Sequence, residues 1–313
     1  MSTGRFAPSP TGDLHLGNLR TALVAWLFAR SSGGAFLLRM EDLDRVQSSR
    51  AHEDSQRRDL SQLGLDWDGP VVRQSERFPL YDEAIDELTA RGLTYPCYCT
   101  RREIREAASA PHGPPSPEGA YPGTCRDLDA AGSSRHEAAG RRPALRLRAQ
   151  VAELTVQDAL LGAVTAAVDD FVLRRNDSVP AYNLAVVVDD AAQGVGTVVR
   201  GDDLATSAPR QRHLADLLGL LAVEYAHVPL VVGPDGTRLA KRDGAVTLSE
   251  QVQRGLSPEA VCGILAESLG QGDGSPTRPV ELVEVFDARS IPKLPWRPDR
   301  RLGVHVDSTS PHV

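Results

Sequence analysis

The chemistry-bearing residues nearest the N-terminus lie in the segment APSPTGDLHLGN, where a turn rich in Pro and Gly leads into a predicted helix. His15 and Gly17 lie at the start of that helix, beside backbone N–H groups that have no partner within it. The positive end of a helix dipole favours a polyphosphate. An imidazole there can donate to phosphate oxygens as charge develops, and a glycine lets a nucleotide approach the backbone. Taken alone, such a histidine is more often a helix cap or a satisfied surface group.

A basic loop follows more than two hundred residues later, after the turn at 233–236. Arg238, Lys241 and Arg242 carry its charge, and the loop ends at Gly244. Lysines on mobile loops can close over phosphates as point charges. By itself this loop could equally be a solvated surface turn.

Three of the four cysteines are close in sequence, at Cys97, Cys99 and Cys125. Four cysteines in 313 residues do not make a disulfide framework, so their clustering favours a metal site over three ordinary thiols. Thiolates in a tetrahedron suit Zn²⁺, and a closed site with four ligands is structural. Cys262 lies in an apolar helical stretch and is predicted to belong to the core.

The composition is that of a soluble globular protein, with 41% apolar and 25% charged residues. No apolar run is long enough for a membrane span or a signal peptide, so we expect a cytoplasmic protein without a membrane partner. The formal net charge of -7 argues against an indiscriminate nucleic-acid binder. The segment 141–148 could still form a local basic face or a solvated strand.

A βαβ unit is predicted to position the histidine turn. The pattern predicts a strand at 5–7, a helix at 16–30 that stops at Gly33-Gly34, and a strand at 35–39. Because a strand, helix and strand in this order favour parallel pairing, we expect a parallel sheet.

The amino-acid composition changes between residues 95 and 179, where Pro, Gly, Ser and Ala are frequent. We interpret this segment as an insertion. The chain is then predicted to return to the sheet. The expected elements are a strand at 185–188, a strand at 198–200, a helix at 209–221, a strand at 228–232 and a helix that starts near Ser257. The tail beyond Trp296 is expected to be loose.

These residues, taken together, resemble the HIGH and KMSKS signatures of class I aminoacyl-tRNA synthetases, specifically of the glutamyl and glutaminyl branch. The opening RFAPSPTGDLHLGNLRTAL carries the first signature, and RMEDLDR, PAYNLAVVVDD and VRGDDL resemble further blocks in the right order. The second signature is altered, since residues 238–242 read RLAKR and only Lys241 is identical. The hydroxyl of the central serine is absent at Ala240.

The resemblance implies an α/β fold, with a Rossmann-like parallel sheet, an inserted zinc-bearing subdomain and a small helical C-terminal part. It places the catalytic domain at 1–94 and 180–237, and an RNA-contacting zinc subdomain at 95–179. A KMSKS-like loop and helical stem-contact region would occupy 238–298, followed by a tail at 299–313.

The resemblance also implies roles for individual residues. Catalysis falls to His15 and Lys241, and ATP with Mg²⁺ would be bound by His15, Gly17, Asn18 and Lys241. The residues implied to bind glutamate are Arg5, Ala7, Ser9, Glu41, Tyr182 and Arg200. Bidentate pairing with an arginine selects a carboxylate over an amide. For Glu41 and Arg200, a structural ion pair at strand ends is the simpler alternative.

One structural zinc ion per chain is implied at Cys97, Cys99, Cys125 and Tyr121, since this subfamily uses three cysteines and a tyrosine. Tyr121 is the ligand most open to question, because its phenol must be deprotonated by the metal. His112 and His136 are the obvious substitutes. Val186 replaces an asparagine found in the full-length glutamyl enzymes, a departure that we expect of their shorter relatives.

The chain resembles the shorter glutamyl-queuosine branch more closely, because it ends before a further anticodon-reading helical domain could fit. The implied reaction joins L-glutamate and ATP and transfers glutamate to queuosine in the anticodon stem-loop of tRNA(Asp), by a protein that we expect to be a monomer. Three alternatives stay open at this point. They are a minimal glutamyl-tRNA synthetase that charges the acceptor end, a nucleotidyltransferase of the same fold, and a non-catalytic zinc-bearing RNA adaptor.

Overall fold

The computed structural model describes residues 2–108, 120–233, 235–237, 239, 247–298 and 300–303. Its strands are β1 Gly4–Phe6, β2 Phe36–Met40, β3 Val72–Arg73, β4 Thr94–Cys97, β5 Ala144–Leu147, β6 Glu153–Asp158, β7 Gly162–Ala167, β8 Val172–Arg174, β9 Thr197–Gly201 and β10 Glu224–Val228. Its α-helices are α1 Leu16–Ser31, α2 Arg50–Leu63, α3 Phe78–Ala90, α4 Arg101–Ala108, α5 Ala130–Ala138, α6 Tyr182–Ala192, α7 Ala208–Leu217, α8 Leu248–Gln253, α9 Pro258–Ser268 and α10 Pro279–Leu282.

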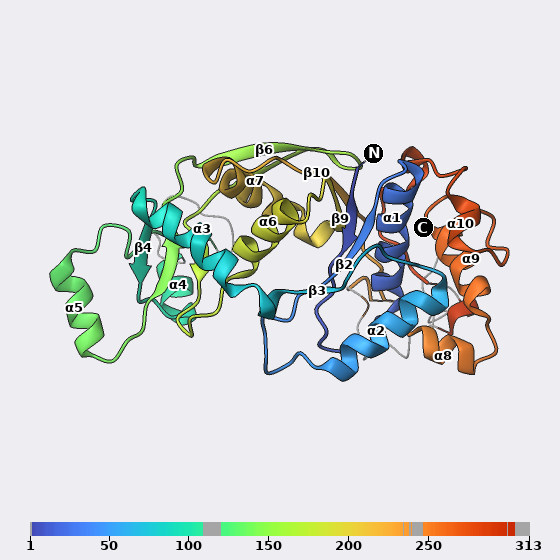
Figure 1. The fold of residues 1–313 in the computed structure, drawn as a ribbon, viewed down its shortest axis with the longest axis horizontal. Helices are drawn as coiled ribbons and strands as arrows, with labels where there is room; N and C mark the ends of the chain where they lie inside the picture. The colour runs from blue at the N-terminus through green and yellow to red at the C-terminus, as the bar shows by residue number, and fades with distance from the viewer. Residues whose placement is uncertain are drawn as a thin grey trace.

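A main sheet runs through the middle of the molecule in the strand order β3-β2-β1-β9-β10-β6-β7, flanked by helices (Figure 1). All neighbours in it pair in parallel except the hairpin β6–β7. The predicted βαβ unit is confirmed, since β1, α1 and β2 form with Arg5 opposite Leu37. The α/β class and the parallel core of the sheet therefore agree with the sequence.

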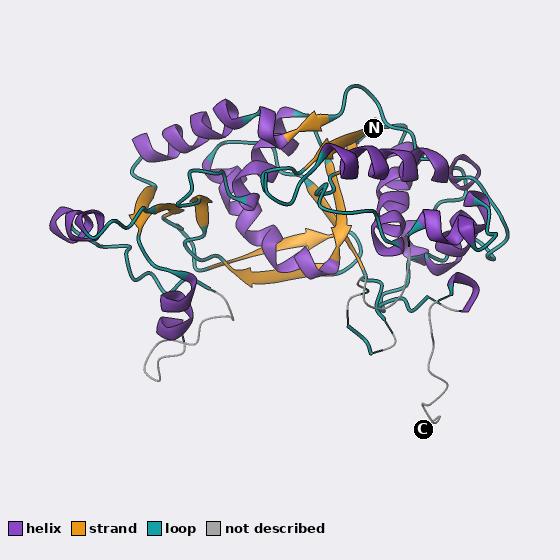
Figure 2. Ribbon diagram, turned by 90° about the horizontal axis from the view of Figure 1, so that it is seen from below, coloured by secondary structure: helices purple, strands orange, loops and turns teal. Residues whose placement is uncertain are grey.

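A separate antiparallel sheet, β4-β5-β8, lies to the left of the main sheet, with α4 and α5 near it (Figure 2). These elements come from the segment 95–179 and its borders. The same segment also contributes β6 and β7, which extend the main sheet beside β10. Part of the expected insertion is thus built into the edge of the main sheet. No described helix is long and apolar enough to cross a membrane.

The strand that we predicted at 185–188 is wrong, because these residues lie in α6. The helix is buried over most of its length, and Leu184, Val186 and Val188 pack in the core with α3 and α7. A short apolar run that is buried all round carries no periodicity that separates strand from helix. The strand predicted at 228–232 is displaced in a similar way. It ends at Val228, where Pro229 cannot donate a ladder hydrogen bond, and starts earlier, at Glu224.

A buried cluster of charges fixes α6 to the sheet. Arg39 on β2 is fully buried and contacts Asp190 at 2.7 Å, Asp189 at 3.7 Å and Glu41 at 3.5 Å. Asp189 also accepts hydrogen bonds from Tyr81 on α3 and from the side chains of Gln74 and Arg77 just before α3. Burial opposes the ionisation of Asp190, but Arg39 and Arg5 outweigh it and lower its pKa.

We predict that Arg39→Met lowers the free energy of unfolding by about 3–5 kcal/mol, because three carboxylates would lose a fully buried partner. Urea denaturation measures the change. Arg212→Met is the matched control, since Arg212 forms an exposed pair with Asp216 one turn along α7, and its loss should cost about 0.5 kcal/mol or less. Equal losses in the two variants would contradict the structural role of Arg39.

Candidate functional site

A cavity of about 590 Å³ opens where β1 and β9 end and α1 begins. The carboxyl ends of adjacent parallel strands are the usual ligand position in such sheets. Its walls include all of the described residues that we predicted to bind ligand: Arg5, Ala7, Ser9, His15, Gly17, Asn18, Glu41, Tyr182 and Arg200. Only Lys241 is missing from this set, because it lies outside the described residues, as do Arg238, Ala240 and Arg242.

His15 is the N-cap of α1. Its Nδ1 accepts from the backbone N–H of Gly17 at 3.1 Å, and Asn18 Oδ1 accepts from the backbone N–H of His15 at 3.2 Å. The cap that we considered as the simpler explanation is therefore present. It also has a chemical consequence, because a neutral imidazole that accepts at Nδ1 carries its hydrogen on Nε2. Nε2 is then the donor that a phosphate oxygen in the cavity could use.

The imidazole of His15 leaves no room for a side chain at Gly17. A Cβ at this position would lie 2.9 Å from Cε1 of His15 and 3.4 Å from Cβ of Val231. Any larger residue must displace the imidazole from its capping position. The glycine therefore keeps His15 in place, besides leaving backbone exposed to the cavity.

Two described residues of this region, Leu239 in the KMSKS-like segment and Thr247 after it, lie beside the start of α1. His15 forms an isolated antiparallel bridge with Thr247, which is the N-cap of α8. Leu239 is buried in the core cluster that contains Leu16, and its backbone N–H donates to Val231 O at 3.0 Å. Leu239 and Thr247 are therefore adjacent in space to the segment that carries the first signature.

Arg200, at the end of β9, has a guanidinium held by several partners. Its NH1 donates to Gln211 Oε1 at 2.8 Å and to the Tyr182 hydroxyl at 3.3 Å, and its Nε donates to His227 Nε2 at 3.0 Å. Its NH2 donates to the carbonyl of Leu204 at 3.3 Å. Four of the five N–H groups of the guanidinium are therefore held by the protein, which fixes its orientation and leaves one hydrogen on NH2 for a carboxylate.

Arg5 and Glu41 place opposite charges in the same cavity. Arg5 donates to the Val199 carbonyl at 3.1 Å and pairs with Asp190 at 3.4 Å. Glu41 pairs with Arg39, so the ion pair that we considered between Glu41 and Arg200 is not the arrangement that forms. Burial raises the pKa of Glu41 against the opposing effect of Arg39 and Arg5. A bound ammonium group would favour its ionised form.

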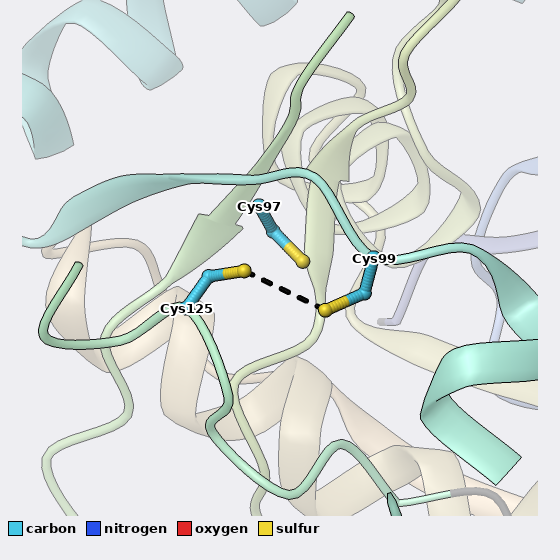
Figure 3. Close-up of side chains that lie close together, drawn as sticks. All are labelled: Cys97, Cys99 and Cys125. Atoms are coloured by element: carbon cyan, nitrogen blue, oxygen red, sulfur yellow. Dashed lines mark hydrogen bonds between the residues drawn. The ribbon is translucent and has the colours of Figure 1, made fainter. Parts of the chain in front are cut away.

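Three thiols and a phenol converge in the small β4-β5-β8 part of the molecule. The sulfurs of Cys97, Cys99 and Cys125 lie within 4.8 Å of one another (Figure 3). The Tyr121 hydroxyl lies 3.3 Å from Cys97 Sγ and 3.7 Å from Cys99 Sγ. Ligands about 2.0–2.3 Å from a tetrahedral ion lie about 3.3–3.8 Å apart, so this donor set can hold a metal.

Of these groups, the Cys97 thiol is the one whose pKa is shifted toward the ionised form, whereas Cys99 and Tyr121 would need a bound cation to ionise. Burial opposes the Cys97 thiolate, but the Tyr121 hydroxyl and Arg146 together lower its pKa. Burial raises the pKa of Cys99 to about 12 and that of Tyr121 above its usual range. Among the substitutes that we considered, His136 is stacked on Tyr98 outside the group, and His112 lies outside the described residues.

Sequence reasoning missed several residues that shape the cavity. Gln56 on α2 donates to the carbonyls of Ser9 and Gly12 at 3.0 and 2.7 Å and so holds the first turn. His227 and Gln211 orient Arg200. No local pattern marks these three, because each acts only after distant elements have packed. Val186 is buried in the α6 core and does not line the cavity, so its replacement of asparagine adds apolar packing there.

Comparisons with known proteins agree with this geometry. The model of the catalytic domain of class I tRNA synthetases (E and Q) matches residues 2–270. The chain is 60% identical to the glutamyl-Q tRNA(Asp) synthetase of Nocardia farcinica over 94% of this chain and 92% of that protein. For the enzyme of that name from Symbiobacterium thermophilum, identity is 49% over 95% and 96%. The structure of a glutamate tRNA ligase from Elizabethkingia meningosepticum, in complex with its amino acid, matches with a TM-score of 0.80 and 27% identity. This match covers 95% of this chain and 66% of that one.

Proposed function

Because the chain belongs to the glutamyl and glutaminyl family of class I tRNA synthetases, we propose that it activates L-glutamate with ATP and transfers it to queuosine in tRNA(Asp). The main structural support is that the predicted glutamate residues and the capped histidine share one cavity. The 60% identity to a glutamyl-Q tRNA(Asp) synthetase over nearly its whole length favours the queuosine base over the acceptor end as the target.

In the first step, the α-carboxylate of glutamate attacks the α-phosphorus of ATP in line. The bond to the bridging oxygen breaks, and glutamyl-adenylate and pyrophosphate result. Mg²⁺ bound with ATP would neutralise part of the phosphate charge. His15, through Nε2–H, and Lys241 donate to the phosphate oxygens as negative charge builds.

Glutamate would be selected by the charges on the cavity wall. Arg200 is held by Tyr182 and Gln211 and would receive a carboxylate, while Glu41 would bind the ammonium group. Arg5 adds a second buried guanidinium. Glutamine would be disfavoured, because its neutral amide lacks the negative charge that pairs with Arg5 and Arg200.

In the second step, a cyclopentene hydroxyl of queuosine attacks the carbonyl carbon of the mixed anhydride. An ester forms, AMP leaves, and the hydroxyl proton is released. The segment 95–179 and the helical region 238–298 would contact the anticodon stem-loop, with 1–94 and 180–237 as the catalytic domain. We expect one chain to act alone in the cytoplasm.

We predict that radiolabelled glutamate is incorporated, with ATP, into queuosine-containing tRNA(Asp) but not into tRNA(Asp) that lacks queuosine. Periodate treatment of the queuosine-containing RNA before the reaction should prevent labelling, because it cleaves the diol of the cyclopentene ring. The labelled product should be labile to alkali. Label on the 3′-terminal adenosine of either RNA would instead favour the minimal glutamyl-tRNA synthetase. ATP turnover without glutamate would favour a nucleotidyltransferase.

We predict that His15→Asn and Lys241→Ala each reduce glutamate-dependent pyrophosphate exchange by about 10²–10³, because each removes one donor to the transition state. His15→Asn should leave the free energy of unfolding nearly unchanged, since asparagine is a good N-cap, whereas His15→Ala should lower it by about 0.5–2 kcal/mol. Near-normal pyrophosphate exchange in His15→Asn would show that this histidine acts only as a helix cap.

Zinc is the metal that we propose for the cluster of Cys97, Cys99, Cys125 and Tyr121. Thiolates favour Zn²⁺, and four protein ligands leave no open position for catalysis. Arg146 lies 3.6 Å from the centre of the Tyr121 ring and would offset the excess negative charge of the ligands. The ion would join β4 to the segment that contains Tyr121 and Cys125, and so would have a structural role.

The purified protein is predicted to contain about one zinc ion per chain by atomic emission spectroscopy. Cys99→Ser and Cys125→Ser should lose most of it, and the chelator-treated protein should unfold at lower urea concentration. Cys262→Ala is the control, because Cys262 is buried in α9 and is expected to keep full zinc content. Full zinc content in both serine variants would exclude this cluster as the site.

A further inference from the structure

A chain of buried hydrogen bonds leads from the cavity to the edge of the main sheet. Arg200 on β9 donates from Nε to Nε2 of His227 on β10 at 3.0 Å, and Nδ1 of His227 lies 2.6 Å from Oδ2 of Asp158 on β6. The side chains of His227 and Asp158 are both 0% exposed, and neither residue lines the cavity. The three residues lie on neighbouring strands of one sheet.

The direction of each hydrogen bond in this chain is forced. A guanidinium only donates, so Nε2 of His227 must present its lone pair to Arg200. The hydrogen of a neutral imidazole is then on Nδ1, where it donates to Asp158 Oδ2. The other carboxylate oxygen, Oδ1, accepts from the backbone N–H groups of Leu160 and Leu161 at 2.9 Å each. Asp158 therefore stabilises the one tautomer of His227 that can accept from Arg200.

We propose that Asp158 and His227 are positioning residues, which hold the Arg200 guanidinium in the orientation that receives a carboxylate of the amino acid. This inference rests on the proposed binding of glutamate by Arg200. It gives the edge hairpin β6–β7 a role in the amino-acid site, although the hairpin belongs to the segment 95–179. The affinity for glutamate then depends on a carboxylate that never touches the substrate.

Asp158→Asn tests the directions of the hydrogen bonds between Arg200, His227 and Asp158, with almost no change in side-chain volume. The backbone donors of Leu160 and Leu161 keep the amide oxygen in the position of Oδ1, so the amide NH₂ faces Nδ1 of His227. The imidazole must then accept at Nδ1 and carry its hydrogen on Nε2. That hydrogen points at the Nε–H of Arg200, and two donors in opposition displace the guanidinium.

We expect Asp158→Asn to raise KM for glutamate about 10–100-fold in pyrophosphate exchange, as for the loss of one hydrogen bond to a charged group. KM for ATP should change less than about threefold, since ATP binds elsewhere in the cavity. His227→Leu should show the same selective loss. His227→Gln should recover most of it, because its amide oxygen can take the place of Nε2. Asp216→Asn, on the exposed face of α7, is the matched control.

A spectroscopic measurement follows the tautomer itself. In protein labelled with ¹⁵N-histidine, the His227 signal is identified by its absence from His227→Gln. Two-bond correlations should show the hydrogen on Nδ1 in the wild type and on Nε2 in Asp158→Asn.

Three results would overturn the inference. One is an unchanged KM for glutamate in Asp158→Asn, another is a parallel loss for glutamate and ATP together with lower stability, and the third is a wild-type hydrogen on Nε2. The proposed function fails separately, if the wild-type protein catalyses no glutamate-dependent exchange at all.

Discussion

The pairing of Arg39 with the two adjacent aspartates of α6 is the interaction on which the rest of the structure depends. A fully buried guanidinium can persist only beside compensating carboxylates, so β2 and α6 must meet at this one place. Asp190 extends the same pairing to Arg5 on β1, and Asp189 extends it to the start of α3. The cluster thus lies between the hydrophobic core around α1 and the core around α6, and it leaves Arg5 and Glu41 at the wall of the cavity.

The cavity combines two kinds of electrostatic environment. On one side, α1 begins with a histidine cap, and its backbone N–H groups favour phosphate. On the other side, buried arginines and one glutamate provide discrete charges for an amino acid. Activation of an amino acid by ATP needs both ligands side by side. The parallel strands β1 and β9 supply this arrangement because both end at the same edge of the sheet.

Much of this could be predicted from the sequence, where local signals were strong. The βαβ unit around α1 follows from helical spacing and a glycine stop, and the residues that line the cavity follow from long motifs in the right order. The assignment of α6 failed because three consecutive valines resemble a strand, whereas packing on every side favours a buried helix. Asp158 and His227 could not be found this way. They are 69 residues apart, and only the pairing of β6 with β10 brings them together.

The hairpin β6–β7 also limits which segments of this protein can be exchanged with those of a relative. A graft of residues 95–179 from a relative would carry over the cluster of Cys97, Cys99 and Cys125 and also the outermost two strands of the host sheet. The donor fragment must therefore pair with β10 of the host and supply the partner of His227, or an open edge and an unsupported imidazole remain. Natural exchange of this segment is subject to the same restriction, so the cysteine cluster and the support of Arg200 are expected to diverge together rather than as separate modules.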